Sequence, residues 1–281
     1  MELIITCWRH NLMHATIRRK METAKTEIIE KPKKNPFHFE WILPVIIKPR
    51  KTIEKITSQE KPVWLTPLVV ISVLIILAAL VAGPIKRNII QMGLNMPESF
   101  QYYSEEQQMQ FMNAQANRTS PLFLYVFPIL TSLAGLWVSF FLLSSLLHLS
   151  LTLAGSRSQN VRSYNLVGWS MLPLGVRLLV QIVAMLVTKT VVSNPGLSGF
   201  ITGDIKGFAA FAAALLALID IYFIWQIILL LVGVRPLSGL KRSSAWMATA
   251  ISLVILMLLQ SVPGFLSSAL SGLTSSTPFY F

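Results

Sequence analysis

The sequence predicts an all-α, polytopic membrane protein with five transmembrane helices and a basic cytoplasmic N-terminal segment. Hydrophobic residues make up 53% of the 281 residues and charged residues only 13%, whereas an average soluble domain carries about 25% charged residues. The apolar residues also gather in five successive runs, each long enough to cross a bilayer, for which a helix needs about 20 residues. Composition and patterning therefore agree on the class.

Each apolar run is predicted to be one helix, because a segment surrounded by hydrocarbon must satisfy its own backbone N–H and C=O groups. Trp64 opens the first run at a position suited to an interfacial indole ring. Together the runs form a predicted transmembrane domain over 64–270, followed by an outer tail over 271–281. The five predicted spans are 64–85, 122–150, 165–187, 208–234 and 245–270.

The segment before the first span is basic. Residues 1–63 hold 13 of the 24 Lys and Arg residues, and 1–36 is expected to be a disordered cytoplasmic tail. A basic segment beside a span is attracted to anionic lipid. No motif that reads DNA or RNA accompanies the charge, so the sequence indicates a membrane anchor and not a nucleic-acid-binding protein.

Residues 37–63 form a juxtamembrane amphipathic segment in this prediction. Pro49 suits the first turn of a short helix that carries Ile53 and Ile56 on one face. Lysines lie on the other face. This pattern is typical of a helix that lies on the cytoplasmic surface of a membrane.

The orientation follows from the Lys and Arg residues in the segments that flank the spans, since cytoplasmic loops carry an excess of them. Ten flank the spans on the N-terminal side and five on the opposite side. We therefore expect the N-terminus in the cytoplasm and, after five crossings, the C-terminus outside. The ten are Lys48, Arg50, Lys51, Lys55, Lys61, Arg157, Arg162, Arg235, Lys241 and Arg242; the five are Lys86, Arg87, Arg118, Lys189 and Lys206.

Two ionisable residues fall deep inside predicted spans, Arg177 in the third and Asp220 in the fourth. A charge near the middle of a bilayer costs about 2.5–3.5 kcal/mol on insertion scales, and two antiparallel neighbours can offset that cost by pairing. We predict an Arg177–Asp220 ion pair near the midplane that faces the bundle interior. The pair either fixes the helix register or forms a gate, an ion site or a lipid-headgroup site; alternatively, Arg177 reaches an interface.

The sequence predicts no enzyme, and neither a cofactor nor a metal site. Cys7 is the single cysteine, which excludes an intramolecular disulfide and a thiolate metal cage. The string Gly-Leu-Ser-Gly around Ser198 matches the nucleophile motif of rhomboid-type proteases, but a serine nucleophile needs a base within about 3 Å. The candidate base His148 is predicted at the other side of the bilayer, which argues against a protease.

Two short motifs indicate a family. The string PVWLTPLVV opens the first span with a Pro-x-Trp pattern at Pro62 and Trp64. The string VGWSMLPLGV in the third span is similar to a Gly-Tyr-x-x-Leu-Pro pattern. Gly168 and Pro173 keep that pattern, and Trp169 replaces the tyrosine.

The third motif completes the resemblance. In the fourth span, Trp225 precedes an apolar run, Gly233 and a short basic turn. In their order and in the five-span topology, these motifs resemble the Yip (Ypt-interacting protein) family over about residues 40–270.

The resemblance implies a cytoplasmic N-terminus, an outer C-terminus and a non-enzymatic role. Eukaryotic Yip proteins bind small GTPases and act in vesicle formation. This chain lacks their acidic Asp-Leu-Tyr-Gly stretch and has Thr-Ser-Gln-Glu-Lys at 57–61, which argues against GTPase binding. The Gln- and Met-rich outer loop resembles prokaryotic members, so the resemblance implies a prokaryotic plasma-membrane protein.

Two function hypotheses follow. The first is a Yip-like protein that scaffolds or organises the membrane through lipid contacts and through homo- or hetero-oligomers. The second is a transporter or permease subunit that uses the Arg177/Asp220 pair. Five spans do not divide into equal halves, as an inverted-repeat transporter requires.

Overall fold

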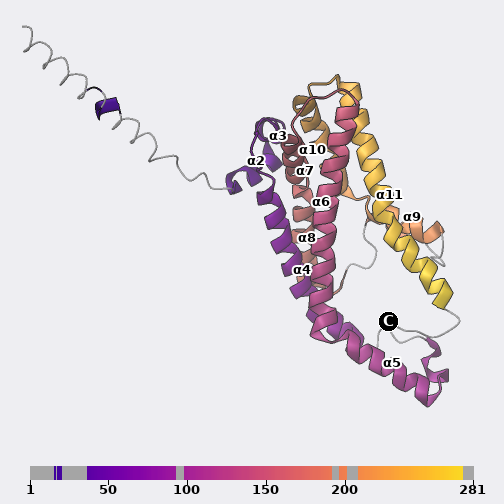
Figure 1. The fold of residues 1–281 in the computed structure, drawn as a ribbon. Helices are drawn as coiled ribbons and strands as arrows, with labels where there is room; N and C mark the ends of the chain where they lie inside the picture. The colour runs from indigo at the N-terminus through magenta and orange to yellow at the C-terminus, as the bar shows by residue number, and fades with distance from the viewer. Residues whose placement is uncertain are drawn as a thin grey trace, which may run out of the picture. The chain divides into compact units, whose positions relative to one another are not determined.

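The chain divides into two compact units, Met1–Pro36 and Phe37–Phe281. The computed structural model describes most of the second unit and a few residues of the first. All helices named below belong to the second unit (Figure 1). The predicted disordered tail, apart from Thr16 and 18–20, and the outer tail from 275 onward lie outside the described residues. The described residues are 16, 18–20, 37–92, 98–191, 196–200 and 208–274, with 98–99 and 264–274 described as backbone only.

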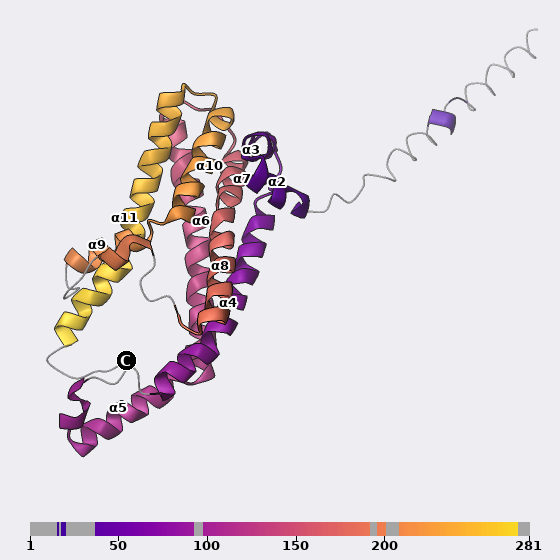
Figure 2. The same ribbon diagram turned by 180° about the vertical axis from the view of Figure 1, so that it is seen from behind.

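The described residues form an all-α fold with five helices long and apolar enough to cross a membrane, as predicted. Most of these helices run side by side in a bundle when seen from opposite directions (Figures 1 and 2). The five are α4 (Leu65–Gln91), α6 (Phe127–Leu153) with the π-helical turn η3 (Leu122–Val126), α7 (Asn160–Ser170) continued by α8 (Leu172–Thr188), α10 (Ile221–Ser238) and α11 (Arg242–Thr274), of which Arg242–Pro263 is the spanning part.

The fourth predicted span, 208–234, is wrong in extent. The chain forms a separate short helix, α9 (Phe208–Ala217), then breaks and starts α10 at Ile221. Helix α9 packs against α11 and does not continue the line of α10 (Figure 2). Both pieces are apolar, so hydropathy alone merges them.

Shorter helices flank the spans. Before the first span lie the 3-10 turn η1 (Phe39–Trp41), α2 (Ile42–Ile47) and α3 (Pro49–Thr57). Pro49 is in the first turn of α3, as predicted from its fixed φ. After the first span come η2 (Glu98–Tyr102) and α5 (Glu105–Arg118). A capping box between Ser104 and Gln107 starts α5. The 3-10 turn η4 (Gly196–Phe200) lies between α8 and α9.

Helix α3 differs from the prediction in what its apolar face meets. Ile53 and Ile56 are fully buried, and α3 packs against α7 and α10. The amphipathic face therefore covers protein and not the membrane surface. An apolar stripe shows that a helix is covered, but the covering can be either lipid or protein.

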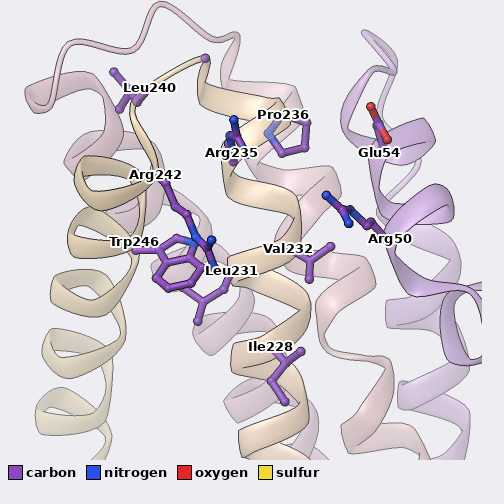
Figure 3. A pocket seen from close by; sticks show the side chains of 11 residues that line it. Arg50, Glu54, Ile228, Leu231, Val232, Arg235, Pro236, Leu240, Arg242 and Trp246 are labelled. Carbon is purple, nitrogen blue, oxygen red and sulfur yellow. The ribbon is translucent and has the colours of Figure 1, made fainter.

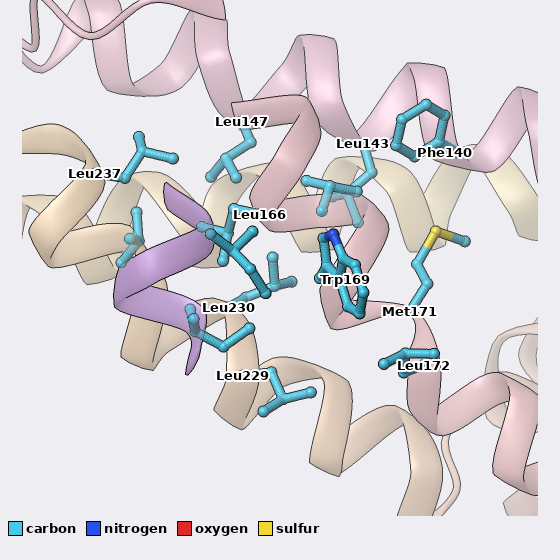
Figure 4. Packing of buried hydrophobic residues seen from close by; sticks show 14 of the residues in the cluster. Phe140, Leu143, Leu147, Leu166, Trp169, Met171, Leu172, Leu229, Leu230 and Leu237 are labelled. Carbon is cyan, nitrogen blue, oxygen red and sulfur yellow. The ribbon is translucent and has the colours of Figure 1, made fainter. Parts of the chain in front are cut away.

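The cluster of buried hydrophobic side chains joins α3, α4, α6, α7, α10 and α11. Trp169 is fully buried among leucines that converge from α6, α7 and α10 (Figure 4). One end of the bundle is formed by α3, the turn at 154–159 and the turn at 239–241, and we call it the basic end. The ten Lys and Arg residues counted on the N-terminal side of the spans lie at this end or in the chain that leads into α4.

Candidate functional site

The predicted ionisable residues meet where the fourth span breaks. Asp220 precedes α10 with an extended backbone, and its Oδ1 accepts a hydrogen bond of 2.8 Å from the backbone N–H of Phe223. An aspartate at this position satisfies a free donor of the first turn and is stabilised by the helix dipole. Asp220 is thus an N-cap, which explains why α10 starts at Ile221.

Arg177 in α8 completes the pair. Its Nε lies 3.2 Å from Oδ2 of Asp220 in an ion pair, and the two side chains are 24% and 14% exposed. The structure thus brings together the two residues that the sequence suggested. Each charge has its counterpart close by, which reduces the cost of placing both among apolar helices.

The predicted depth of the pair near the midplane stays a prediction. Helix α10 has 18 residues, which at 1.5 Å per residue is about 27 Å. Asp220 caps the end of that helix opposite Ser238, whereas Arg177 lies 11 residues, about 16 Å, before the end of the apolar segment Asn160–Thr188.

The break also explains the Gly-Leu-Ser-Gly string. The backbone N–H of Leu197 in η4 donates to the C=O of Ile219 at 3.1 Å, which gives a partner to a carbonyl that the break leaves free. Gly196 has φ +61°, and a Cβ there would lie 2.7 Å from the carbonyl oxygens of Ala217 and Ile219. The glycine permits this close approach, so the string has a structural role.

A cavity of about 470 Å³ lies beside the pair, between α4, α6, α8, α10 and α11. This volume is typical of small-ligand sites. Most of the residues that line the cavity are apolar, and a few are polar. Gln260 donates to the hydroxyl of Ser139 at 2.6 Å across α11 and α6. The polar lining consists of Lys86, Ser132, Ser139, Arg177, Gln181, Gln226 and Gln260.

This chemistry suits binding more than catalysis. The cavity offers amide donors and acceptors, one guanidinium group and apolar walls, a combination that fits an amphiphile with a polar head. Among the residues that the structure describes, no three His, Cys, Asp or Glu side chains gather as a metal site would require. The described part of the cavity also contains no paired nucleophile and base.

The Pro-x-Trp motif is fastened to α7 at the basic end. Val63 lies between Pro62 and Trp64. Its backbone N–H donates to Oδ1 of Asn165 at 2.8 Å, and its C=O accepts from Nε1–H of Trp169 at 3.0 Å. Asn165 also donates to the C=O of Lys61 at 2.9 Å. Pro62 itself is exposed. Residues 59–63 are thereby fixed to a buried surface before the chain enters the first span.

Asn165 is the residue that sequence reasoning missed. It is fully buried, yet at the start of an apolar run an asparagine looks like an ordinary helix-start residue. The available signal was its spacing of four from Trp169, since side chains at i and i+4 share one helix face.

Two glycines and a proline of the motifs allow close packing. A Cβ on Gly168 would lie 2.8 Å from Cβ of Trp64, so this glycine lets the start of α4 approach α7. Pro173 is buried in the first turn of α8, where its missing N–H does no harm. A Cβ on Gly233 would collide with Leu166 and Ile53. Gly233 is therefore where α3, α7 and α10 meet.

Aromatic rings complete the motif packing. Trp64 lies 5.0 Å from Phe140 and 6.3 Å from Trp137, measured between ring centroids. Trp225 is half-buried and packs against the same core. Trp64, Gly168, Trp169 and Gly233 thus make contacts near the basic end. Pro173 lies four residues before Arg177, and Trp225 lies five residues after Asp220.

Comparison with known families supports this picture. The family model described as "Yip1 domain" matches residues 43–262. The chain belongs to the Yip1 domain family. The match begins in α2 and ends in α11, so it takes in the docked segment and all five spans. No curated protein and no solved structure matches the chain. Membership and the five apolar helices together make this a multi-pass Yip-like membrane protein.

Proposed function

We propose that this Yip-family protein is a non-enzymatic organiser of the membrane, which acts through lipid contacts and protein partners at its basic end. The observation that carries the proposal is the docking of residues 37–63 on the bundle. Ile53 and Ile56 are buried while Lys51 and Lys61 are exposed. The segment before the first span is therefore a fixed, positively charged surface.

The proposed orientation puts this surface in the cytoplasm of a prokaryote, at the plasma membrane. Ten of the Lys and Arg residues that flank the spans belong to the basic end and five to the other side, and cytoplasmic loops carry the excess of such residues. The N-terminus is then cytoplasmic and the C-terminus outside. Anionic lipid of the inner leaflet attracts each basic residue near its surface by about 1 kcal/mol.

Extraction of the full chain from native membrane into polymer-bounded discs tests the proposal. We expect enrichment of anionic lipid over the bulk membrane, together with a second copy or a partner protein. A Lys51→Glu/Lys61→Glu variant should lose part of the lipid enrichment and keep its fold, because both side chains are exposed. A monomer surrounded by lipid of bulk composition would contradict the proposal.

A transporter or permease subunit is the second candidate. It is favoured by the chain break at Asp220 beside the polar-lined cavity, since transporters place broken helices at their binding sites. Solute flux in proteoliposomes that disappears in Asp220→Asn would support transport. A stable complex with partner protein and no flux favours the organiser.

A further inference from the structure

A second cavity, at the basic end, has a different character. It measures about 860 Å³ and lies between α3, α10 and α11 (Figure 3). Three arginines line it, one from each of these helices: Arg50, Arg235 and Arg242. The acidic residue of its lining is Glu54, so three guanidinium groups and one carboxylate leave two net positive charges.

The tight turn between α10 and α11 brings two of the arginines together. Gly239 ends α10 with φ +67°, and its N–H donates to the C=O of Arg235 at 3.1 Å. This C-cap geometry suits glycine. It lets α11 start at Arg242, only seven residues after Arg235, on the neighbouring helix. Arg50 reaches toward α10 from α3 (Figure 3).

These arginines form no ion pair with the described residues. Within the described residues, no carboxylate oxygen lies within 4.0 Å of a side-chain nitrogen of Arg50, Arg235 or Arg242. The guanidinium of Arg242 instead lies over the Trp246 ring, 4.0 Å from its centroid. This cation–π contact orients Arg242 and leaves its N–H groups available to an anion.

The lower wall of the cavity is apolar. Leu231 and Ile228 line it on α10, one and two turns from Arg235 respectively. The seven residues from Ile228 to Arg235 rise about 10 Å, so the charged rim and the apolar wall are separated as a phospholipid separates its phosphate from its acyl chains. Ile228 is 52% exposed and Trp246 36% exposed, so the wall opens toward lipid.

We propose that this cavity binds one anionic phospholipid, with its phosphate between Arg50, Arg235 and Arg242 and an acyl chain along Ile228 and Leu231. The inference rests on the proposed role at a lipid surface and adds one specific site to it. Guanidinium groups bind phosphate oxygens through paired, charge-assisted hydrogen bonds. A soluble protein partner would not need the apolar wall, and a neutral lipid would not need the arginines.

Native mass spectrometry of the full chain in detergent tests the site. The probe is dioleoylphosphatidylglycerol, with dioleoylphosphatidylcholine as the acyl-matched neutral lipid. We expect one tightly bound phosphatidylglycerol and weaker binding of phosphatidylcholine. The Arg235→Gln/Arg242→Gln variant should weaken phosphatidylglycerol binding at least about tenfold, because each lost charged hydrogen bond contributes on that order.

The matched control is Arg118→Gln/Lys189→Gln, which removes the same charge from exposed residues on the opposite side of the spans. Its affinity for the first phosphatidylglycerol should stay within about twofold of the unmodified protein, as expected for distant surface changes. Equal losses in both variants, or no preference over phosphatidylcholine, would overturn the site. Displacement of the lipid by inorganic phosphate alone would show an anion site without the acyl contact, and would also overturn it.

This experiment separates the site from the proposed function. If Arg235→Gln/Arg242→Gln loses the bound lipid but keeps its partner protein and its lipid enrichment in native discs, the site is real and the organiser role does not depend on it. If the unmodified chain binds no specific phosphatidylglycerol yet assembles with partners in native discs, the site falls and the organiser role remains.

Discussion

The contact of α3, α7 and α10 at the basic end and the region around Asp220 are built in opposite ways. At this contact, Ile53, Leu166 and Trp169 are fully buried, and Gly233 allows the three helices to touch, while the arginine-lined cavity opens on another side of α3 and α10. Around Asp220 the chain breaks, a cavity of about 470 Å³ opens, and polar side chains face one another. One region depends on close packing and the other on paired polar groups.

This difference indicates which part of the bundle is rigid and which part can adapt. Close-packed interiors tolerate little change of volume, so the basic end can present a fixed surface. A lined cavity beside a broken helix can admit a ligand or change shape. Substitutions should therefore have different signatures in the two regions: loss of packing at the first, coupling between charges at the second.

The largest effect is expected at Trp169. Trp169→Ala removes a fully buried ring and should lower the free energy of unfolding by about 3–5 kcal/mol. Trp169→Phe keeps most of the ring but leaves the C=O of Val63 without its donor, and should cost about 1–3 kcal/mol. Unfolding of the purified protein in detergent, followed by circular dichroism, measures both. A smaller loss of stability for Trp169→Ala than for Trp169→Phe would contradict the close packing of the basic end.

The ion pair gives the next effect. Arg177→Ala or Asp220→Ala should each cost about 2–3 kcal/mol, less than the 3–5 kcal/mol of a fully buried pair, because each leaves a partly buried charge alone. The Arg177→Ala/Asp220→Ala double variant should be less damaged than either single variant. Asp220 also caps α10, so its variant should be the more damaged of the two. Additive losses in the double-mutant cycle would show that the two charges do not interact.

Two glycine substitutions test how closely the basic end is packed. Gly233→Ala introduces a methyl group that collides with Leu166 and Ile53, and should cost about 1–3 kcal/mol. Gly135→Ala is the matched control, because its added methyl has nothing within 4 Å, although Gly135 lines the cavity. Thermal unfolding midpoints in one detergent compare them. Equal midpoints would mean that the basic end is less closely packed than described.

The smallest effect concerns pH. The hydrogen bond of 2.9 Å from His38 lowers the pKa of the exposed Glu40 carboxyl below its ordinary value. A lowered pKa in the folded state adds stability above the ordinary carboxyl pKa, and that stability is lost as the pH falls through the lowered value. The small advantage of the unmodified protein over Glu40→Gln should therefore shrink between about pH 6 and about pH 3. A constant difference across that range would contradict the interaction.

Much of the fold could be predicted, because hydrocarbon allows few solutions. Apolar runs of sufficient length must be helices, and all five were found. Two points could not be predicted from hydropathy. Phe208–Ala217 and Ile221–Ser238 are both strongly apolar, so the break between them depends on Asp220, which can cap a helix as well as form an ion pair. Ile53 and Ile56 form the same stripe whether lipid or protein covers them.

The candidate site was predictable to the same limited degree. Arg177 and Asp220 stood out because charges in apolar segments need counterparts. The cavity beside them depends on the relative positions of five helices, which no local pattern contains. Asn165 was hidden for the same reason, since its partners lie about 100 residues earlier, in the chain before α4. The arginine cluster was hidden because Arg50 lies on a helix distant in sequence from Arg235 and Arg242.

The segment before the first span is built into the core of the bundle. Ile53 of α3 and Leu166 of α7 both lie against Gly233, so a double-mutant cycle of Ile53→Ala and Leu166→Ala tests it most directly. We predict a coupling energy of about 0.5–3 kcal/mol in unfolding measurements. Additivity within about 0.3–0.5 kcal/mol, with little loss for Ile53→Ala alone, would instead place α3 on the lipid surface and contradict the account.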